Sequence, residues 1–281
     1  MNDLRMVGRV ALQGDAAGVR ESDGGAAGMP AAHVTIRGLT KTFGKVRIYD
    51  DFDLDIPRGK LVSIFGPNGC GKSTLINLIA GLIPVDDGEI LFDGKPLSEI
   101  KFGYVFQNYR EALFPWLRSF ENIEYPLRLK NLPKAERRAR VERLVNHLGV
   151  KIDLSRYPYE LSGGQQQLLS IMRALVVEPE ILFLDEPFSA LDYEMTLFMR
   201  EQLQRIFVDT GTTTVLVSHD LEEAVYLADR ILLLSRHPAR VADFVHYEAP
   251  RPRNVETLSN PAFVRIKAHC LDIFQREVRR T

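Results

Sequence analysis

Nine residues, Gly66–Thr74, constrain the fold of this chain more than any other stretch. They read GPNGCGKST, so three glycines, one lysine and two hydroxyl side chains stand close together. The run KLVSIF (Lys60–Phe65) precedes them and LINLIAGLI follows, which predicts a strand, a glycine-rich turn and a buried helix. A turn this rich in glycine weakens a fold unless something must approach its backbone closely.

The turn matches the phosphate-binding pattern G-x-x-x-x-G-K-[ST] in the context that the pattern requires, after a strand and before a helix. Its backbone N–H groups can converge on phosphate oxygens, and the first helical turn adds unpaired N–H groups and the positive end of its dipole. Lys72 is expected to bridge β- and γ-phosphate oxygens, and the Ser73 hydroxyl to bind Mg²⁺. The nucleotide-binding residues expected here are Gly66, Pro67, Asn68, Gly69, Cys70, Gly71, Lys72, Ser73 and Thr74. A flexible strand–helix turn without a ligand is the alternative.

A second predicted apolar strand, in ILFLDEP, has Asp185 and Glu186 at its carboxyl end. This placement fits the metal-binding acid of a P-loop nucleoside triphosphatase. Asp185 is expected to hold Mg²⁺ directly or through water, and Glu186 to polarise an attacking water as the general base. The alternative is surface charge that ends a strand, and the phosphate-binding pattern argues against it.

Strands that alternate with helices along the chain indicate an α/β fold with a mainly parallel sheet. Between Arg118 and about Val150 the pattern is helical and basic, but Glu136 and Glu142 are interleaved. A solvated helix face is therefore favoured there over a nucleic-acid surface. The last segment places five apolar residues at helical spacing, which predicts an amphipathic helix: Phe263, Ile266, Cys270, Ile273 and Phe274.

Composition limits the partners and the compartment. The 36 lysines and arginines nearly cancel the 37 aspartates and glutamates, which argues against nucleic acid or an anionic membrane surface as a partner. Cys70 and Cys270, the two cysteines, are far apart, which fits a reducing compartment and argues against a disulfide framework or a zinc site. No uncharged apolar run approaches the length of a spanning helix. Residues 1–31 lack the apolar core of a signal peptide and are expected to form a disordered tail.

A set of motifs in this chain resembles those of the ATP-binding cassette (ABC) ATPases, in that family's order, over about residues 33–247. Beside the phosphate loop and the acidic strand, GYVFQ resembles the Q-loop, LSGGQ the signature motif, SALD the D-loop and SHD the switch histidine. The residues that carry these motifs are Gln107, Ser162, Gly163, Gly164, Gln165, Asp192 and His219. Phe43, in KTFGK, stands where the family keeps an aromatic residue that stacks on adenine.

The resemblance implies a P-loop NTPase fold of the ABC type. This fold combines a mainly parallel core sheet, an antiparallel β subdomain and an α-helical signature subdomain. Applied to this sequence, it implies an ATPase domain over residues 32–247, a helical subdomain over about 108–178, and a C-terminal helical appendage over 248–281. One departure stands in the signature helix, where the family commonly has arginine and this chain has Leu168.

The resemblance also implies Mg²⁺-dependent ATP hydrolysis. It makes Glu186, His219 and Gln107 catalytic residues, and it places Ser73, Gln107 and Asp185 around Mg²⁺. A second copy of the chain, or a homologous ABC subunit, is expected to close the site. ATP on the phosphate loop of one subunit would then face Ser162–Gln165 of the other, where the start of a helix offers a second anion-binding end. Asp192 is expected to help the two sites communicate.

Within the family, a single cassette of this size resembles the ATPase subunit of a bacterial importer, peripheral at the cytoplasmic face of the membrane. FPW at Phe114–Trp116 resembles the LPW run of nitrate, sulfonate and taurine importer ATPases, which implies a small anionic solute. Trp116 as an ordinary core residue is the alternative. Transmembrane permease subunits are expected to dock near Gln107–Trp116, and an extracytoplasmic solute-binding protein to act only indirectly.

Two other functions stay open beside transport. One is an ATP-gated interaction module that hardly turns over, although Glu186 and His219 argue against it. The other is a soluble ABC ATPase that acts on nucleic acid, and the near-neutral charge of the chain argues against that function. No nucleic-acid partner is therefore expected.

Overall fold

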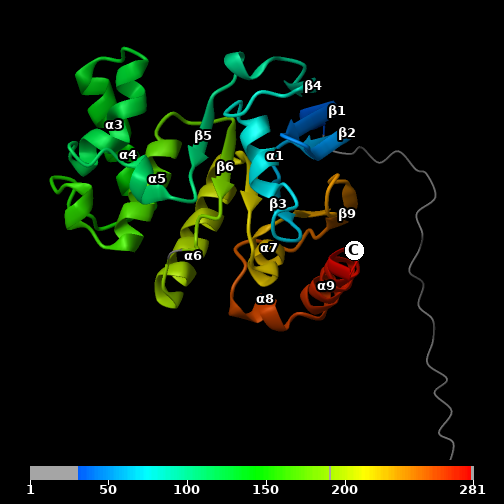
Figure 1. Ribbon diagram of the computed structural model, residues 1–281. Coiled ribbons are helices and arrows are strands. Elements are labelled where there is room, and N and C mark those ends of the chain that lie inside the picture. Colours follow the sequence, from blue (N-terminus) through cyan, green and yellow to red (C-terminus); the bar gives the residue numbers. More distant parts are fainter. Residues whose placement is uncertain (1–30, 190, 280–281) are drawn as a thin grey trace, which may run out of the picture.

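The computed structural model describes residues 31–189 and 191–279, and it contains two β-sheets with helices packed around them (Figure 1). The tail predicted over residues 1–31 lies outside the described residues except for its last position. In the described part of the chain, no helix combines the length and the apolar character needed to span a bilayer.

The larger sheet has six strands in the order β5-β6-β7-β3-β8-β9. Their bounds are β3 (Leu61–Phe65), β5 (Phe102–Val105), β6 (Ile181–Asp185), β7 (Thr213–Val217), β8 (Arg230–Leu234) and β9 (Val241–His246). All neighbouring strands are parallel except β8 and β9, which are antiparallel. The prediction of a mainly parallel core sheet is confirmed.

The smaller sheet is antiparallel, with the order β2-β1-β4. Its strands are β1 (Ala32–Phe43), β2 (Val46–Pro57) and β4 (Asp87–Phe92). Phe43 pairs with Val46, so β1 and β2 form a hairpin with two residues in its loop. Gly44, the first of these, has φ 59°, a backbone conformation that two-residue hairpin loops require. The predicted antiparallel β element is present.

Nine α-helices and two short 3₁₀ helices connect the strands in the described residues. They are α1 (Lys72–Ile79), α2 (Tyr109–Ala112), α3 (Ser119–Leu129), α4 (Lys134–Leu148), α5 (Gly163–Leu175), α6 (Tyr193–Thr210), α7 (Leu221–Leu227), α8 (Val255–Ser259), α9 (Pro261–Arg279), η1 (Leu97–Glu99) and η2 (Pro158–Glu160). Helices α3, α4 and α5 group together beside β5, the outermost strand on one side of the larger sheet (Figure 1). Division of the chain into domains at the predicted boundaries stays a proposal.

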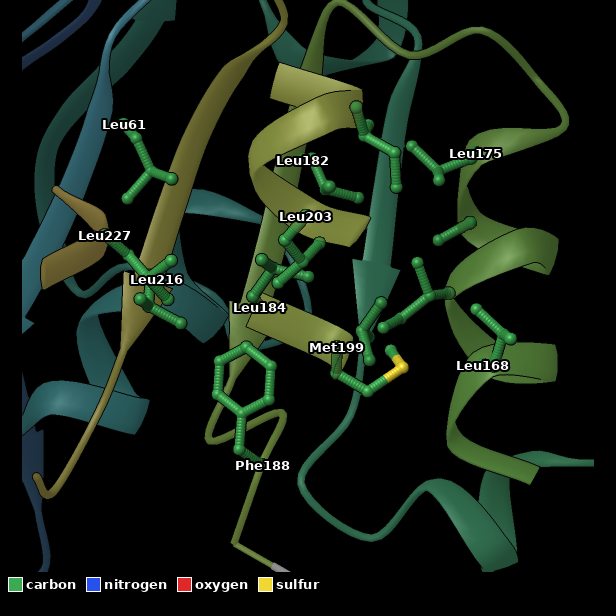
Figure 2. Packing of buried hydrophobic residues seen from close by; sticks show 14 of the residues in the cluster. Leu61, Leu168, Leu175, Leu182, Leu184, Phe188, Met199, Leu203, Leu216 and Leu227 are labelled. Atoms are coloured by element: carbon green, nitrogen blue, oxygen red, sulfur yellow. The ribbon is translucent and has the colours of Figure 1, made fainter. Parts of the chain in front are cut away.

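Two apolar clusters cover the two faces of the larger sheet. Alternate residues of a strand point to opposite faces, so β6 contributes to both clusters. Leu182 and Leu184 face α5, α6 and α7, and Figure 2 shows them near Leu203 of α6. Ile181 and Phe183 join the cluster that contains residues of α1 and the smaller sheet. Every residue of β6 is buried, as expected for a parallel strand covered on both sides.

Helix α4, which is rich in basic residues, carries the solvated face that the sequence indicates. Arg138 pairs with Glu142 at 2.7 Å and Arg140 with Glu136 at 2.8 Å, both at helical i, i+4 spacing. Two of its arginines are therefore paired within the helix, and a third, Arg137, pairs with Glu124 of α3 at 3.1 Å.

The C-terminal helix α9 packs against α7, β8 and β9. The five apolar residues predicted to share one of its faces do so, since Phe263 and Cys270 are buried and Ile266, Ile273 and Phe274 pack against the same cluster. The rings of Phe274 and Phe65 lie 5.1 Å apart, so this helix covers the strand that leads into the glycine-rich turn.

A buried arginine, Arg253, ties the segment before α8 to α7. Its Nη1 donates to the carbonyl oxygens of Val225 (3.1 Å), Tyr226 (2.8 Å) and Ala228 (2.8 Å), around the end of α7. These are the carbonyls that a helix leaves without intrahelical partners. The side chain is buried, and burial lowers the pKa of the Arg253 guanidinium to about 10.

Asp229 joins this arginine to the start of β3. Its Oδ1 accepts a hydrogen bond from Arg251 at 2.8 Å and lies 3.5 Å from Arg253 Nη2. Its Oδ2 accepts from the N–H of Leu61 at 3.0 Å. One buried carboxylate therefore connects the C-terminal segment with the strand that precedes the glycine-rich turn.

Replacement of Arg253 by methionine is expected to lower the free energy of unfolding by about 3–5 kcal/mol, because it leaves a buried carboxylate and several carbonyls short of partners. Arg205→Met is the control, because Arg205 forms an exposed pair with Glu201 in α6 and should cost no more than ~0.5 kcal/mol. Urea denaturation followed by circular dichroism measures both variants. Equal midpoints would contradict a stabilising role of Arg253.

Candidate functional site

Four neighbouring parallel strands end at one edge of the larger sheet, and each is followed by a polar residue that the sequence marks for nucleotide chemistry. Gln107 follows β5, Glu186 follows β6, His219 follows β7, and the loop that leads to Lys72 follows β3. The carboxyl ends of parallel strands meet at the same edge, which is where ligands bind in open α/β sheets. The register of the sheet therefore assembles the candidate site.

The loop over residues 66–71 joins β3 to α1 and curls around the amino group of Lys72. Lys72 Nζ donates to the carbonyl oxygens of Gly66 at 2.9 Å and Pro67 at 3.1 Å, and the side chain is buried. Both acceptors are neutral, so they do not balance the positive charge of the amino group. A buried cation in this state favours an anionic ligand, as predicted for phosphate.

Close packing explains why glycine stands at position 71. Gly71 has φ 112°, and a Cβ atom there would lie 2.8 Å from Ile48 Cγ2 and 2.9 Å from the Tyr49 hydroxyl oxygen. That hydroxyl donates to the Gly71 carbonyl oxygen at 3.0 Å. Tyr49 thus supports the loop from β2. The sequence does not predict that Tyr49 supports the site, because a tyrosine in a strand is an ordinary residue.

The other predicted loop residues differ in exposure. Pro67 and Cys70 are buried, Asn68 is exposed, and Thr74 is half-buried. Burial raises the pKa of the Cys70 thiol, so this side chain is a neutral part of the loop's support. The exposed side of the loop is therefore free of ionised side chains.

Ser73 and Asp185 come together although 112 positions separate them in the sequence. The Ser73 hydroxyl donates to Asp185 Oδ1 at 3.1 Å. Asp185 is buried, and burial raises the pKa of its carboxyl, while the hydrogen bond from Ser73 opposes that rise. A hydroxyl and a carboxylate oxygen side by side fit Mg²⁺, which binds proteins through one or two such groups and takes further ligands from phosphates and water.

Glu186 lies between two other predicted catalytic residues. Its Oε2 accepts a hydrogen bond from Gln107 Nε2 at 2.8 Å and lies 3.4 Å from His219 Nδ1. Glu186 has φ 47°, a left-handed conformation that is strained for a residue with a side chain. Its N–H donates to the Val217 carbonyl at 3.0 Å, which holds the backbone in that conformation. The structure thus joins Gln107, Glu186 and His219 in one cluster.

The placement of Gln107 bears on its predicted role as a Mg²⁺ ligand. Its side-chain amide is engaged with Glu186, whereas Ser73 pairs with Asp185. Within residues 31–189 and 191–279, no group of three or more His, Cys, Asp or Glu side chains is arranged to hold a metal ion. Mg²⁺ ligation by Ser73, Gln107 and Asp185 therefore stays a proposal in which phosphate oxygens complete the coordination.

The signature residues form a second cluster at the start of α5. Ser162 and Gln165 make reciprocal side-chain bonds to each other's backbone N–H groups, a capping box. Gly164 is covered by Met195, since a Cβ atom on Gly164 would lie 2.4 Å from Met195 Cγ. Asp192 accepts from the Met195 N–H at 2.8 Å and caps α6. The signature and D-loop residues are thus packed together through Met195, which the sequence does not mark.

The structure also shows the surroundings of three further positions named from the sequence, Gly163, Phe43 and Trp116. At Gly163, a Cβ atom would lie 3.1 Å from the Tyr109 hydroxyl, so α2 approaches the signature turn closely. Phe43 ends β1 with 46% of its surface exposed, and its ring lies 5.3 Å from Lys41 Nζ. Trp116 is 70% exposed, so the alternative that it is a core residue is wrong.

Comparisons with known proteins agree with this architecture. The family model described as ABC transporter matches residues 49–189. The chain belongs to the ABC transporter family. The sulfate/thiosulfate import ATP-binding protein CysA of Neisseria meningitidis (strain Z2491) is 44% identical over 213 residues, which cover 72% of this chain and 58% of that protein. This chain therefore spans less than two thirds of the CysA relatives it matches.

Other family members match over nearly their whole length. The ABC transporter ATP-binding protein MJ0412 of Methanocaldococcus jannaschii is 35% identical over 249 residues, 86% of this chain and 91% of that protein. The dimeric ABC transporter cassette MJ0796 superposes with a TM-score of 0.68 at 31% identity, over 77% of this chain and all of that one. CbiO1 of Clostridium perfringens, part of an ABC transporter complex, has a TM-score of 0.70 at 25% identity, over 86% and 99%. The predicted ABC ATPase fold is confirmed.

Two glycines of the phosphate loop should respond differently to alanine. Gly69 has φ 75° and no atom within 4 Å of the added Cβ, so Gly69→Ala should cost about 1–2 kcal/mol of stability through backbone strain alone. Gly71→Ala adds overlap with Ile48 and Tyr49 and should cost a further ~1–3 kcal/mol. Chemical denaturation of the two variants measures the difference, and equal losses would contradict the packing described here.

Proposed function

We propose that the chain is the ATP-hydrolysing subunit of a membrane importer. One observation carries the proposal, namely that Glu186 stands between Gln107 and His219 at the strand edge that also holds Lys72 and the Ser73–Asp185 pair. Phosphate binding, metal binding and proton transfer thus have their groups on one edge. The ATP-binding relatives, and a structure of MJ0796 described as a post-hydrolysis state bound to ADP and phosphate, support the same activity.

In the proposed reaction, the nucleotide phosphates bind the loop at Gly66–Gly71 and the N-terminus of α1. Lys72 exchanges its two carbonyl acceptors for phosphate oxygens. Ser73, Asp185 and the amide oxygen of Gln107 would hold Mg²⁺, which would supply positive charge that offsets the charge of the phosphates. Glu186 accepts a proton from water as the water oxygen bonds to the γ-phosphorus, and the bond to the β–γ bridging oxygen breaks. Gln107 and His219 hold Glu186 and the water in place.

The site is proposed to close against a second cassette, either another copy of this chain or a homologous ABC subunit. The backbone N–H groups of Gly163 and Gly164, at the start of α5, lie between the two N–H groups that the capping box uses, and this helix end would bind the nucleotide of the partner. The dimeric structure of the related cassette MJ0796 supports this arrangement. Binding of ATP would then join the two subunits, and hydrolysis would remove the link between them.

A groove of about 340 Å³ beside β5 is the proposed docking site for permease subunits. Its walls come from β5, the segment after it, α3 and α5, with Phe102, Gly103, Tyr104, Phe106, Ala112, Phe114, Tyr125, Pro126, Arg173, Ala174 and Val177 lining it. Trp116 stands exposed next to it, with its ring 5.6 Å from that of Phe114. Exposed aromatic residues beside a groove are typical of protein interfaces. This docking would place the chain peripherally on the cytoplasmic face of the membrane.

The solute is proposed to be a small anion of the nitrate, sulfonate or taurine class. Support comes from the Phe114–Trp116 run and from relatives whose names specify sulfate and thiosulfate import. A solute-binding protein outside the membrane would select the solute and act on this chain only through the permease.

Glu186→Gln should lower steady-state phosphate release by at least about 100-fold while ATP still binds, because the amide cannot accept the proton. Glu201→Gln is the matched control, since Glu201 is an exposed residue of α6. Lys72→Ala should instead weaken ATP binding itself. Unchanged hydrolysis by Glu186→Gln would exclude Glu186 as the base. If the wild-type assembly binds ATP without steady-state release, the chain is an ATP-gated module instead.

Trp116→Ala should weaken copurification with the permease subunits by at least about 10-fold, since Trp is enriched among interface hot spots, which are worth about 2 kcal/mol or more each. Leu129→Ala is the control, because Leu129 is similarly exposed (68%) and ends α3 outside the groove. Detergent-solubilised complexes with coexpressed permease subunits provide the measurement. Equal recovery of both variants would place the docking site elsewhere.

A further inference from the structure

Glu223 is a buried acid that has no place in the proposed reaction. It lies in the first turn of α7 and is 5% exposed. A buried carboxylate costs free energy unless hydrogen bonds and an opposite charge compensate it. Burial raises the pKa of the Glu223 carboxyl, and side-chain donors from two other segments, Ser218 and Arg200, oppose that rise. These two donors show which parts of the molecule Glu223 joins.

The first donor, Ser218, directly precedes His219. Its hydroxyl donates to Glu223 Oε2 and accepts from the N–H of Asp220 at 3.0 Å. The carbonyl oxygen of Asp220 lies 3.1 Å from the same hydroxyl, but a hydroxyl has one proton to donate, and an ionised carboxylate is the stronger acceptor. One serine oxygen therefore links the backbone on the far side of His219 to the carboxylate of Glu223.

Asp220 fixes the same turn from its other end. Its Oδ1 caps α7 by accepting from the N–H groups of Glu222 at 2.8 Å and Glu223 at 3.1 Å. His219 thus stands between two anchored residues, while its own side chain is 56% exposed and its Nδ1 lies 3.4 Å from Glu186 Oε2. An imidazole this exposed has little packing around it, so its direction depends on the anchored backbone.

The second donor, Arg200, comes from α6. Its Nη2 donates to Glu223 Oε1 at 3.3 Å, and the side chains of the pair are 13% and 6% exposed. The same helix is capped at its start by Asp192, the D-loop residue. Glu223 thus uses one carboxylate oxygen for the turn that carries His219 and the other for the helix that follows the D-loop.

We infer that Glu223 is a positioning residue for His219. It holds the turn at Ser218–Asp220 against α6, so that the imidazole stays beside Glu186. The inference rests on the proposed function in taking His219 to act on the nucleotide. It goes further in assigning a role to an acid that lies outside the motifs and in linking α6 to the turn of His219 within one chain.

Two variants test the inference by the rate of phosphate release from MgATP in the assembled complex. Ser218→Ala removes one hydroxyl and leaves the Arg200–Glu223 pair, whereas Glu223→Gln removes the buried charge. Each should lower kcat by at least about 10-fold with KM near the wild-type value, because a catalytic group is displaced while the phosphate loop is not. The double variant should lose little more than either single one, because both act through the same turn.

A second measurement separates positioning of His219 from general support of the fold. Because Glu186 lies beside the imidazole, Glu186→Gln should move the NMR signal of the His219 ring in a chain with isotope-labelled histidine. That response should become smaller when Ser218→Ala is also present, since the ring is no longer held beside position 186. His219→Ala identifies the signal. A loss of stability alone would not change the response.

Glu222→Gln is the matched control, because Glu222 is the neighbouring acid of α7 and its carboxylate pairs with Lys267 of α9. It should leave kcat and the response of the His219 signal unchanged. Should Glu223→Gln lose its fold, Ser218→Ala carries the test by itself.

Two results would overturn the inference: a kcat of Ser218→Ala equal to wild type, or a lowered kcat with an undiminished response of the His219 signal. Absence of ATP hydrolysis by the wild-type complex would instead contradict the proposed function. The NMR comparison would then still decide whether Ser218 and Glu223 hold His219 beside Glu186.

Discussion

The parallel register of β5, β6, β7 and β3 is the constraint on which the site depends. Leu184 pairs with Val105 on one side and Leu216 on the other, and Ile64 pairs with Val217. These pairings align the strand ends, so that residues from segments more than 100 positions apart face a common space. A slip of one residue in any strand would turn its side chains to the other face of the sheet. Because β3, β6 and β7 are buried on both faces, the close fit of their individual side chains into the two clusters opposes such a slip.

The same edge carries features that a fold without a ligand would avoid. Asp185 and Lys72 are buried, and Glu186 adopts a left-handed backbone conformation. Each of these lowers stability, since desolvated charges and strained backbones cost free energy. The two apolar clusters and the network around Arg253 stabilise the elements on either side. Desolvated charges and strained backbone that gather at one end of the strands, in a chain that is well packed elsewhere, are typical of a functional site.

The sequence predicts the groups that act on the nucleotide but not the residues that support them. Lys72, Glu186 and His219 stand out because their charges or glycine-rich surroundings are unusual directly after apolar strands. Tyr49 and Met195 do not stand out, because an aromatic residue in a strand and a methionine in a helix are ordinary. Their contacts depend on which segments meet in three dimensions. Strand β9 is likewise not predicted, since VADFVH is a half-buried, antiparallel edge strand without a long apolar run.

The two clusters of predicted residues differ in how they are built, and the difference explains why one chain can carry two half-sites. The first cluster is assembled by strand pairing across the sheet. The second, from Ser162 to Gly164 with Asp192, is assembled by helix caps and by Met195 packing on Gly164. A shift at the start of α6 must therefore move Met195 against the signature turn or open the contact. In the proposed dimer, that contact would let the D-loop of each subunit change the helix end that it presents to its partner's nucleotide.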